Sequence, residues 1–424
     1  MIFGAVSDDF TGGLELASLL VRDGVACPLV TSDAALAEAG DVPAVVYAVK
    51  SRVAPVGEAT AAVETAMRAL QAKGAGRLFL KYCATFDSTP AGNIGPCADV
   101  LAAGTQAPFV GFCPSFPEVR RTVHQGHLFV GDRLVSESPK RHDPLTPMDD
   151  PDLVRVLQRQ TAAKVGLVAH DAVAGGRAGI GARVAELAGQ GVRYAIMDAA
   201  DEGDLANVAA ATVDWKLMTG NSSVAAHYPP LWRAAGLLAG APAPRPLPAV
   251  GGSGAVLAGS CAEQTLAQLA RFGERHPVLF LDMQRAIDGA DLAAEALEWA
   301  AARLAAGPAA IATSAGTEAV AAVQQRIGRD PAARLAERVL GDIARGLRAG
   351  GVRRLVVAGG ETSGAVVHAL GCTRLHVGRY EAPGISRAVG VDADPMALCL
   401  KSGKLGPFDM FARVLDDMRH GDAA

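Results

Sequence analysis

Short apolar runs alternate with amphipathic helical patterns along most of the chain. Residues 2–6, for example, form an apolar run that precedes the helical period of residues 12–24. Repeated alternation of this kind predicts mostly parallel β-sheets that are covered by helices on both faces. The expected strands lie at residues 2–6, 44–49, 77–83, 108–114, 165–170, 193–199 and 216–220 in the first half, and at residues 254–260, 276–282, 309–314, 353–360 and 398–404 in the second.

A proline-rich segment separates the two halves. Residues 237–252, LLAGAPAPRPLPAVGG, hold four prolines at alternate positions, and neither a helix nor a central strand tolerates this spacing. We expect an extended linker between two domains, a number that suits a chain of 424 residues. The sequence thus predicts two α/β domains with mostly parallel sheets, at residues 1–236 and 253–420, joined by a Pro-rich linker.

One segment departs from the alternation. Residues 127–138 are expected to form a β-hairpin around Gly131 and Asp132. A helix should follow, with Asp150 as its N-cap and Pro151 as its first residue. The alternation of strands and helices resumes after this helix.

Charge and cysteine content narrow the range of partners and locations. The net charge is −4, which gives no general attraction to nucleic acid or to anionic membranes, and the apolar runs fall short of the ~20 residues of a spanning helix. The first ten residues do not resemble a signal peptide, and the seven cysteines are scattered without a CxxC pair. We expect reduced thiols and a cytoplasmic location. The oligomeric state is not readable, and a homo-oligomer is compatible with the sequence.

Three stretches with glycine lie at the exits of expected strands of the second half, at residues 258–265, 356–370 and 401–411. Ligands collect beyond the carboxyl ends of parallel strands, and main-chain amides at a helix start favour phosphate without a side-chain cation. Lys401 and Lys404 flank the glycine of the third loop and could add positive charge. Mg²⁺ could carry the remainder, as in phosphoryl transfer generally, although no metal ligands are identifiable.

Each of these loops alone could be an ordinary turn or a solvated surface segment. Three of them in one domain predict nucleotide binding. The two commonest nucleotide fingerprints, a Walker A run and a GxGxxG after a strand, are absent.

The first half places polar side chains after several expected strands. After the first strand, Asp9 or Thr11 could cap the next helix, or Asp8 or Asp9 could accept a substrate hydroxyl or its proton. Further along, carboxylates, amides and cations suit a small polyhydroxy acid, because a cation holds its carboxylate while Asp or Asn holds its hydroxyls. These later residues are Lys81, Asp87, Ser88, Asn93, Arg120, Arg121, Gln125 and His127, whereas His124 could be purely structural.

An ordered set of motifs resembles the four-carbon acid sugar kinases, and most closely their 3-oxo-tetronate kinase branch. The resemblance spans almost the whole chain, from Ser7 to Phe411, and the long middle motif is its most specific part. The motifs are DDFTGG (8–13), TFDSTPAGNIGP (85–96), RTVHQGHLFVGDRLVSESP (121–139) with DPLTPM (143–148), AGSCAEQT (258–265), GGETSG (359–364) and KSGKLG (401–406).

The resemblance implies an N-terminal acid-sugar-binding domain and a C-terminal nucleotide-binding domain. It implies transfer of the γ-phosphate of ATP to the terminal (4-)hydroxyl of a four-carbon acid, with 3-oxo-tetronate as the expected substrate. Asp8, Asp9 and the residues of the FDST and HQGH motifs would line the sugar-acid side, and we hypothesise that Asp9 orients or deprotonates the attacking hydroxyl. The residues implied to contact ATP are Ser260, Gly359, Gly360, Glu361, Thr362, Ser363 and Gly403.

The sequence leaves alternatives open. Gly13 and Ala84 stand where many relatives have Ala and Ser, and Ala84 could alter substrate contacts. A D-threonate or erythronate kinase of the same family is the nearest alternative, because one hydroxyl or carbonyl is read by one or two contacts. A non-catalytic α/β sugar-acid-binding protein is an alternative of another class, which the phosphate-type loops disfavour. A dinucleotide dehydrogenase would lack its glycine fingerprint.

Overall fold

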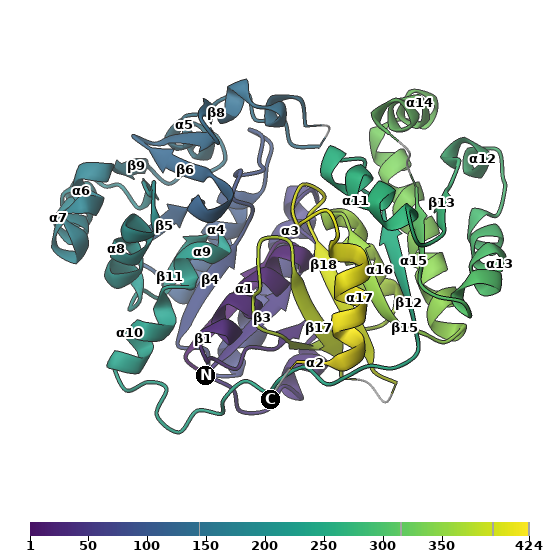
Figure 1. Ribbon diagram of the computed structural model, residues 1–424. Coiled ribbons are helices and arrows are strands. Elements are labelled where there is room, and N and C mark those ends of the chain that lie inside the picture. Colours follow the sequence, from purple (N-terminus) through teal and green to yellow (C-terminus); the bar gives the residue numbers. More distant parts are fainter. Residues whose placement is uncertain (144, 314–315, 392–393, 423–424) are drawn as a thin grey trace. The chain divides into compact units, whose positions relative to one another are not determined.

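A computed structural model describes residues 1–143, 145–313, 316–391 and 394–422 (Figure 1). Pro144 and Ser314, which belong to patterns considered above, lie outside the described residues. The chain divides into two compact units, Met1–Pro244 and Arg245–Ala424. Residues 241–250, which contain the alternating prolines, form neither helix nor strand. No helix in the described part of the chain is long and apolar enough to cross a membrane.

Eight parallel strands form the main sheet of the first unit. Their order is β2, β3, β1, β4, β11, β5, β10 and β9. The strands are β1 (Phe3–Ser7), β2 (Leu29–Val30), β3 (Ala44–Ala48), β4 (Arg77–Lys81), β5 (Val110–Cys113), β9 (Val165–Val168), β10 (Tyr194–Met197) and β11 (Leu217–Gly220). The helices are α1 (Phe10–Arg22), α2 (Asp33–Ala37), α3 (Val56–Ala72), α4 (Ile94–Thr105), α5 (Leu153–Gln158), α6 (His170–Ala174), α7 (Gly176–Gly189), α8 (Glu202–Thr212), α9 (Ser222–Ala225) and α10 (Tyr228–Ala234).

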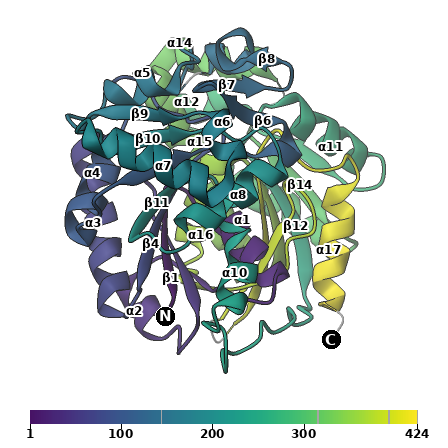
Figure 2. The ribbon, with the colours of Figure 1, turned by 90° about the vertical axis from the view of Figure 1, so that its left-hand side faces the viewer.

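Both faces of this sheet are buried. Successive residues of a strand point to opposite faces, so Leu78 and Leu80 of β4 join a core that includes residues of α3, α4 and α5. Phe79 lies between them and packs on Phe3, with 5.8 Å between the ring centroids. The rings of Phe3 and of Trp232 in α10 have their centroids 5.4 Å apart. Figure 2 shows strands β1, β4 and β11 between α3 and α10.

The predicted hairpin is present and has a third strand. β7 (His127–Val130) and β8 (Arg133–Leu134) turn at Gly131, whose φ is 68°. β6 (Arg121–His124), which the sequence did not predict, pairs antiparallel with β7. Short 3-10 helices flank this small sheet at Pro117–Val119, Val135–Glu137 and Pro139–His142.

The predicted start of helix α5 is wrong. The N-cap is Asp152, whose Oδ1 accepts from the amide of Arg155 at 3.1 Å, and Pro151 precedes the helix. Asp150 instead accepts from Nε of Arg155 at 2.7 Å. The cap is the aspartate that lies three residues before an unpaired helical amide, and Asp150 is two residues too early.

The second unit has a mixed seven-stranded sheet. Its order is β13, β14, β12, β15, β18, β17 and β16. The first five strands are parallel. The last two, which the sequence did not predict, join by antiparallel pairing, β17 with β18 and β16 with β17. The strands are β12 (Ser253–Ala258), β13 (Val278–Phe280), β14 (Ala309–Ala312), β15 (Val352–Ala358), β16 (Arg374–Val377), β17 (Ser386–Gly390) and β18 (Met396–Lys401). The helices are α11 (Glu263–Gly273), α12 (Met283–Ile287), α13 (Leu292–Leu304), α14 (Thr317–Ile327), α15 (Arg329–Ala349), α16 (Gly360–Ala369) and α17 (Met410–His420).

Helices α11 and α17 close one core of this unit. Phe272 of α11 and Phe411 of α17 contact each other at 6.3 Å and share a core with Val256 and Val356. The alternating residue Leu257 is fully buried as well. The expected fold class, two α/β domains with mostly parallel sheets joined by a Pro-rich linker, is confirmed.

Candidate active site

Two aspartates follow strand β1, as the sequence predicted. Asp9 is the N-cap of α1, and its Oδ1 accepts from the amide of Gly12 at 3.0 Å. Asp8 has its carboxylate gripped at both oxygens by Arg52, at 2.8 Å each. Both carboxylates are nearly buried, at 7% and 8% exposure. Asp9 therefore caps helix α1, as one of the two expectations held. Its carboxylate nevertheless lies beyond the end of strand β1, where ligands bind in sheets of this kind.

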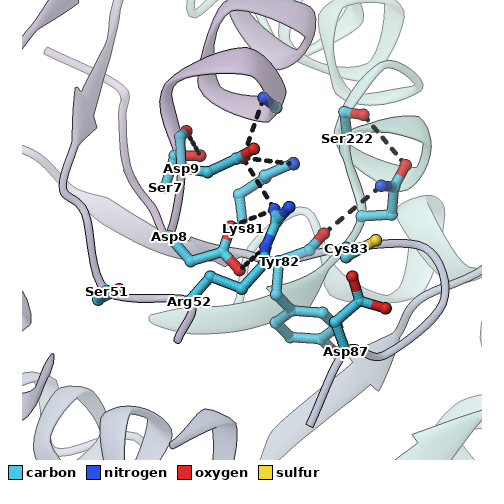
Figure 3. Close-up of polar contacts among 12 residues, drawn as sticks. Ser7, Asp8, Asp9, Ser51, Arg52, Lys81, Tyr82, Cys83, Asp87 and Ser222 are labelled. Carbon is cyan, nitrogen blue, oxygen red and sulfur yellow. Dashed lines mark hydrogen bonds and ion pairs between the residues drawn. The ribbon is translucent and has the colours of Figure 1, made fainter. Parts of the chain in front are cut away.

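Two cations complete this cluster. Arg52, which follows β3, also lies 2.8 Å from Oδ1 of Asp9, and Lys81 at the end of β4 lies 3.5 Å from the same oxygen. Figure 3 shows Asp8, Asp9, Arg52 and Lys81 turned toward one another. Strands β3, β1 and β4 are neighbours, so their carboxyl ends bring the four side chains together. Sequence reasoning missed Arg52, because the loop after β3 has no conspicuous motif.

The surroundings shift the pKa values of the two carboxylates in opposite directions. Burial raises the pKa of Asp8, against the opposing charge of Arg52. Burial acts on Asp9 in the same direction, but the charges of Arg52 and Lys81 and the amide of Gly12 outweigh it and lower its pKa. Asp9 is therefore an ionised hydrogen-bond acceptor at neutral pH. It is better suited to orient a hydroxyl than to remove its proton.

A second charged cluster surrounds Lys140. Its ammonium lies 2.8 Å from Oδ1 of Asp87 and donates to Asp143 at 2.9 Å and to Thr146 at 3.0 Å. Burial would raise the pKa of Asp87, but Lys140 and Arg52 lower it to about 2. The charge of Arg52 therefore reaches both clusters. Lys140 is a further residue that the sequence did not single out.

Arg121 is partly buried at the start of β6. Burial lowers its pKa, while Cys83 and Asp87 oppose that shift. Its guanidinium donates to the main-chain oxygen of Val119. Arg121 therefore interacts electrostatically with Asp87.

Ser88 and Asn93 are tied into the loop between β4 and α4. Ser88 accepts from Nε2 of Gln160 at 2.8 Å, and the amide of Gly95 donates to Oε1 of the same glutamine at 2.9 Å. Asn93 donates to the main-chain oxygen of Ser51 at 2.6 Å. Both predicted residues are buried, at 4% and 5% exposure, and their hydrogen bonds shape the loops that carry Asp87 and Arg52.

The HQGH turn is anchored by a buried carboxylate. Asp198, directly after β10, is fully buried and accepts from the amides of Gln125, Gly126 and His170 at 2.6, 2.9 and 2.9 Å. Gln125 has a positive φ of 50°, and Nδ1 of His127 lies 2.7 Å from its main-chain oxygen. Gln125 and His127 thus belong to a fixed hairpin, but within the described residues no hydrogen bond or ion pair joins their side chains to Asp9 or Asp87.

In the second unit, three loops converge at one edge of the sheet. They follow β12, β15 and β18, which are adjacent and parallel. The amide of Gly259 donates to the main-chain oxygen of Ala358 at 3.0 Å, and the amide of Gly359 donates to that of Lys401 at 2.9 Å. All residues expected to contact ATP lie on these loops or in the first turn of α16: Ser260, Gly359, Gly360, Glu361, Thr362, Ser363 and Gly403.

Glycine is required where these loops touch. A β-carbon on Gly403 would lie 2.0 Å from Oγ of Ser260, and one on Gly259 would lie 2.0 Å from Oγ1 of Thr362. Gly359 has a φ of 129°, which side chains rarely adopt, and its β-carbon would lie 2.9 Å from the same threonine oxygen. The three loops therefore approach closely enough for one ligand to contact them together.

The expectation that flexible lysines reach a phosphate fails for Lys401. Its side chain is fully buried, and the ammonium donates to Oγ1 of Thr265 at 3.1 Å. Lys404 is exposed in the same loop. A lysine at the end of a central strand points into the core beside its neighbours, which a reading of the loop as flexible surface did not anticipate.

No group of three His, Cys, Asp or Glu side chains able to hold a metal occurs in the described part of the chain. Mg²⁺ usually keeps several waters and takes one or two carboxylates together with substrate phosphates. A single carboxylate beside a loop that held the phosphates would fit that ligand set. Glu361, in the first turn of α16, is such a carboxylate.

Comparisons with known proteins agree over the whole chain. A family model described as a sugar-binding N-terminal domain matches residues 3–228, and one described as a nucleotide-binding C-terminal domain matches residues 255–411. Proteins of Burkholderia multivorans and Cupriavidus necator, both named 3-oxo-tetronate kinase, are 44% and 45% identical to the chain. Each alignment covers 98% of this chain and 96% of the relative. The chain belongs to the four-carbon acid sugar kinase family.

The resemblance expected from the sequence, to the 3-oxo-tetronate kinase branch of this family, is confirmed. A solved structure from Salmonella typhimurium LT2, which carries the provisional description of a tRNA synthase, has a TM-score of 0.82 and 32% identity. The alignment covers 97% of this chain and 98% of the Salmonella chain. In the present chain, the predicted residues Asp8, Asp9 and Lys81 form one cluster. Asp87 belongs to the second cluster, and Arg121 interacts with it. Ser88 and Asn93 shape the loops around them.

Proposed function

We propose that the protein is an ATP-dependent sugar-acid kinase that phosphorylates the terminal (4-)hydroxyl of 3-oxo-tetronate. Curated relatives at 42–45% identity over nearly the full length are named for this substrate. The observation that carries the proposal is the convergence of the Ser260, Gly359 and Gly403 loops at one sheet edge. Such a site suits a triphosphate held mainly by main-chain amides.

In the second unit, Ser260, the residues from Gly359 to Ser363, and Gly403 would contact ATP. The positive φ of Gly359 and the missing β-carbon of Gly403 keep space for close approach of phosphate oxygens. Mg²⁺ would neutralise charge on the phosphates during transfer. We propose Glu361 as its protein ligand, with waters and phosphate oxygens supplying the rest.

In the first unit, Asp8, Asp9, Lys81, Asp87 and Arg121 would bind the sugar acid. Lys81 or Arg121 offers a cation for its carboxylate, and ionised Asp9 accepts the hydrogen bond of the attacking hydroxyl. Phosphoryl transfer requires mainly positioning and charge stabilisation. A carboxylate that orients the alcohol is therefore sufficient for the role of Asp9.

The remaining predicted residues have supporting roles in this proposal. Ser88 and Asn93 would set the position of the loop that carries Asp87, through Gln160 and the main chain after β3. Gln125 and His127 would present hydrogen-bonding groups from the hairpin that Asp198 anchors. None of the cysteines in the described part of the chain forms a disulfide, and with ATP as cosubstrate we place the enzyme in the cytoplasm.

D-Threonate or erythronate is the alternative substrate, because these acids differ from 3-oxo-tetronate at a single carbon. A non-catalytic sugar-acid-binding protein would need no triphosphate site, so the converging glycine loops disfavour it. The net charge of −4 gives the chain no general attraction to tRNA.

The test is a coupled assay of ADP release with Mg²⁺ and ATP, run on a panel of 3-oxo-tetronates, D-threonate and erythronate. We expect the highest kcat/KM with a 3-oxo-tetronate, and phosphorus NMR should place the new phosphate on the terminal carbon. Preference for D-threonate or erythronate would select the sibling activity. If none of these acids supported ATP consumption, the proposal would be refuted.

A further inference from the structure

Lys401 carries a buried positive charge that has no carboxylate partner among the described residues. Its side chain is 0% exposed. Its ammonium donates to Oγ1 of Thr265 at 3.1 Å and to the main-chain oxygen of Gly403 at 3.4 Å, and the ring of Phe411 lies 5.9 Å away. All three contacts are neutral. Burying an ammonium costs free energy unless an opposite charge lies beside it. A bound anion near Lys401 would offset that cost.

Lys401 also joins the three loops of the candidate ATP site. Its main-chain oxygen accepts from the amide of Gly359 at 2.9 Å. Thr265, which shares a contact with its ammonium, donates to the oxygen of Gly403 at 2.7 Å and lies in the first turn of α11, directly after the Ser260 loop. Gly403 in turn packs against Ser260. The lysine therefore lies behind the surface that the phosphates would face.

We propose that Lys401 is a positioning residue whose buried charge is balanced by the phosphates of the nucleotide, so that nucleotide binding is coupled to protonation of this lysine. The inference rests on the proposed function, because it takes the anion at these loops to be a nucleotide. It assigns the missing cation of this phosphate site to a residue beneath the loops rather than to one that reaches over them.

The surroundings of Lys401 define how the coupling depends on pH. Burial lowers the pKa of Lys401 to about 8, and Cys399, on the same strand, acts on it in the opposite direction. Burial raises the pKa of Cys399 to about 12, although Arg387 on β17 opposes that shift and Glu381 adds to it. Helices α11 and α17 present uncharged side chains to the ammonium, those of Thr265 and Phe411.

The sign of the effect follows. In the free protein, Lys401 loses its proton as the pH rises through about 8, whereas a bound polyanion favours the charged form and raises the pKa. Nucleotide binding near pH 8 should therefore take up a proton. Affinity should fall as the pH rises above that value.

Calorimetry on the unmodified protein tests the coupling directly. Binding of Mg²⁺–adenylyl imidodiphosphate is measured at pH 8 in two buffers that differ in ionisation enthalpy. With half of Lys401 deprotonated in the free protein, we expect uptake of about half a proton, and a Kd about tenfold weaker at pH 9 than at pH 7. Binding without proton uptake and with equal Kd at both pH values would overturn the inference.

Two variants assign the proton. Lys401→Met removes the ammonium but keeps an unbranched side chain, and it should abolish both the uptake and the tenfold change in Kd between pH 7 and pH 9. Lys404→Met, which changes the exposed lysine of the same loop, should keep the proton uptake of the unmodified protein. Uptake that survives in Lys401→Met, or disappears in Lys404→Met, would contradict the proposal. Complete lack of nucleotide binding by the unmodified protein would instead reject the proposed function.

Discussion

The ammonium of Lys81 occupies the space that a β-carbon on Gly12 would need. Such an atom would lie 1.5 Å from Nζ of Lys81 and 2.6 Å from Oδ1 of Asp9. A β-carbon at this position would therefore displace the ammonium of Lys81 and crowd the carboxylate of Asp9. The same glycine supplies the amide that Asp9 caps, so the lysine, the carboxylate and the helix start fix one another.

Replacing Gly12 with alanine should displace Lys81 and disrupt the cluster. We expect kcat/KM for the sugar acid to fall by about tenfold or more, since a shifted positioning group has a large effect on rate. The Kd for an ATP analogue should not change. Gly181→Ala is the matched control, because it lies within α7 with no atom within 4 Å of its β-carbon and should stabilise the protein by roughly 0.5 kcal/mol. Normal sugar-acid kinetics for Gly12→Ala would contradict the assignment of Lys81.

Asp9→Asn tests the acceptor for the attacking hydroxyl. Asparagine still caps a helix, so α1 should form, whereas the charge that pairs with Arg52 and Lys81 is lost. We expect kcat to fall by about 10² or more because the attacking hydroxyl loses a positioning group. Thermal stability should also fall, because two buried cations lose a charged partner, whereas ATP affinity should change little. Near-normal turnover in steady-state assays would remove Asp9 from this role.

Gly403→Ala should damage the nucleotide side alone. Its β-carbon would lie 2.0 Å from Oγ of Ser260, which forces the two loops apart. We expect the KM for ATP to rise by about tenfold, a loss of roughly 1.4 kcal/mol of binding, while the KM for the sugar acid stays constant. Gly307→Ala, with no atom within 4 Å of its β-carbon, is the control in the same unit. If ATP kinetics were unchanged, the nucleotide would have to bind elsewhere.

The Asp87–Lys140 pair predicts a pH-dependent contribution to stability. Because the folded-state pKa of Asp87 is lowered from 3.8 to about 2, its ionised form stabilises the fold above pH 3.8, and this contribution disappears as the pH falls toward 2. Asp87→Asn should lower the unfolding free energy at pH 7 by about 2 kcal/mol. Urea unfolding at pH 7 and at pH 3 measures the difference between the two proteins, which should shrink at the lower pH. A constant difference would mean that the ion pair is not its source.

Much of the fold was predictable because apolar periodicity reports burial directly. The parallel strands and the proline-rich linker follow from such local patterns. Strands β2, β6, β16 and β17 were missed. β2 has only two residues, and edge and antiparallel strands carry no continuous apolar run. The N-cap of α5 was misplaced because two aspartates, Asp150 and Asp152, satisfy the local rule and only the amide geometry chooses between them.

The candidate site was predictable where chemistry is concentrated in motifs. The three glycine loops and the aspartates after β1 lie at strand ends, as expected. Arg52, Lys140 and Asp198 were missed because each becomes relevant only when the fold brings distant segments together. Lys401 was misjudged because sequence does not reveal that a strand-end lysine turns inward.

The hydrogen bonds between Asp198 and the main chain of the HQGH turn bear on how this kinase could change its substrate preference. The bonds that Asp198 accepts all come from main-chain amides. Apart from the contact of the His127 ring with the main-chain oxygen of Gln125, the anchoring of the turn therefore does not depend on the side chains at positions 125 and 127. New residues there can be sampled, by evolution or in a library, while the platform that presents them keeps its place.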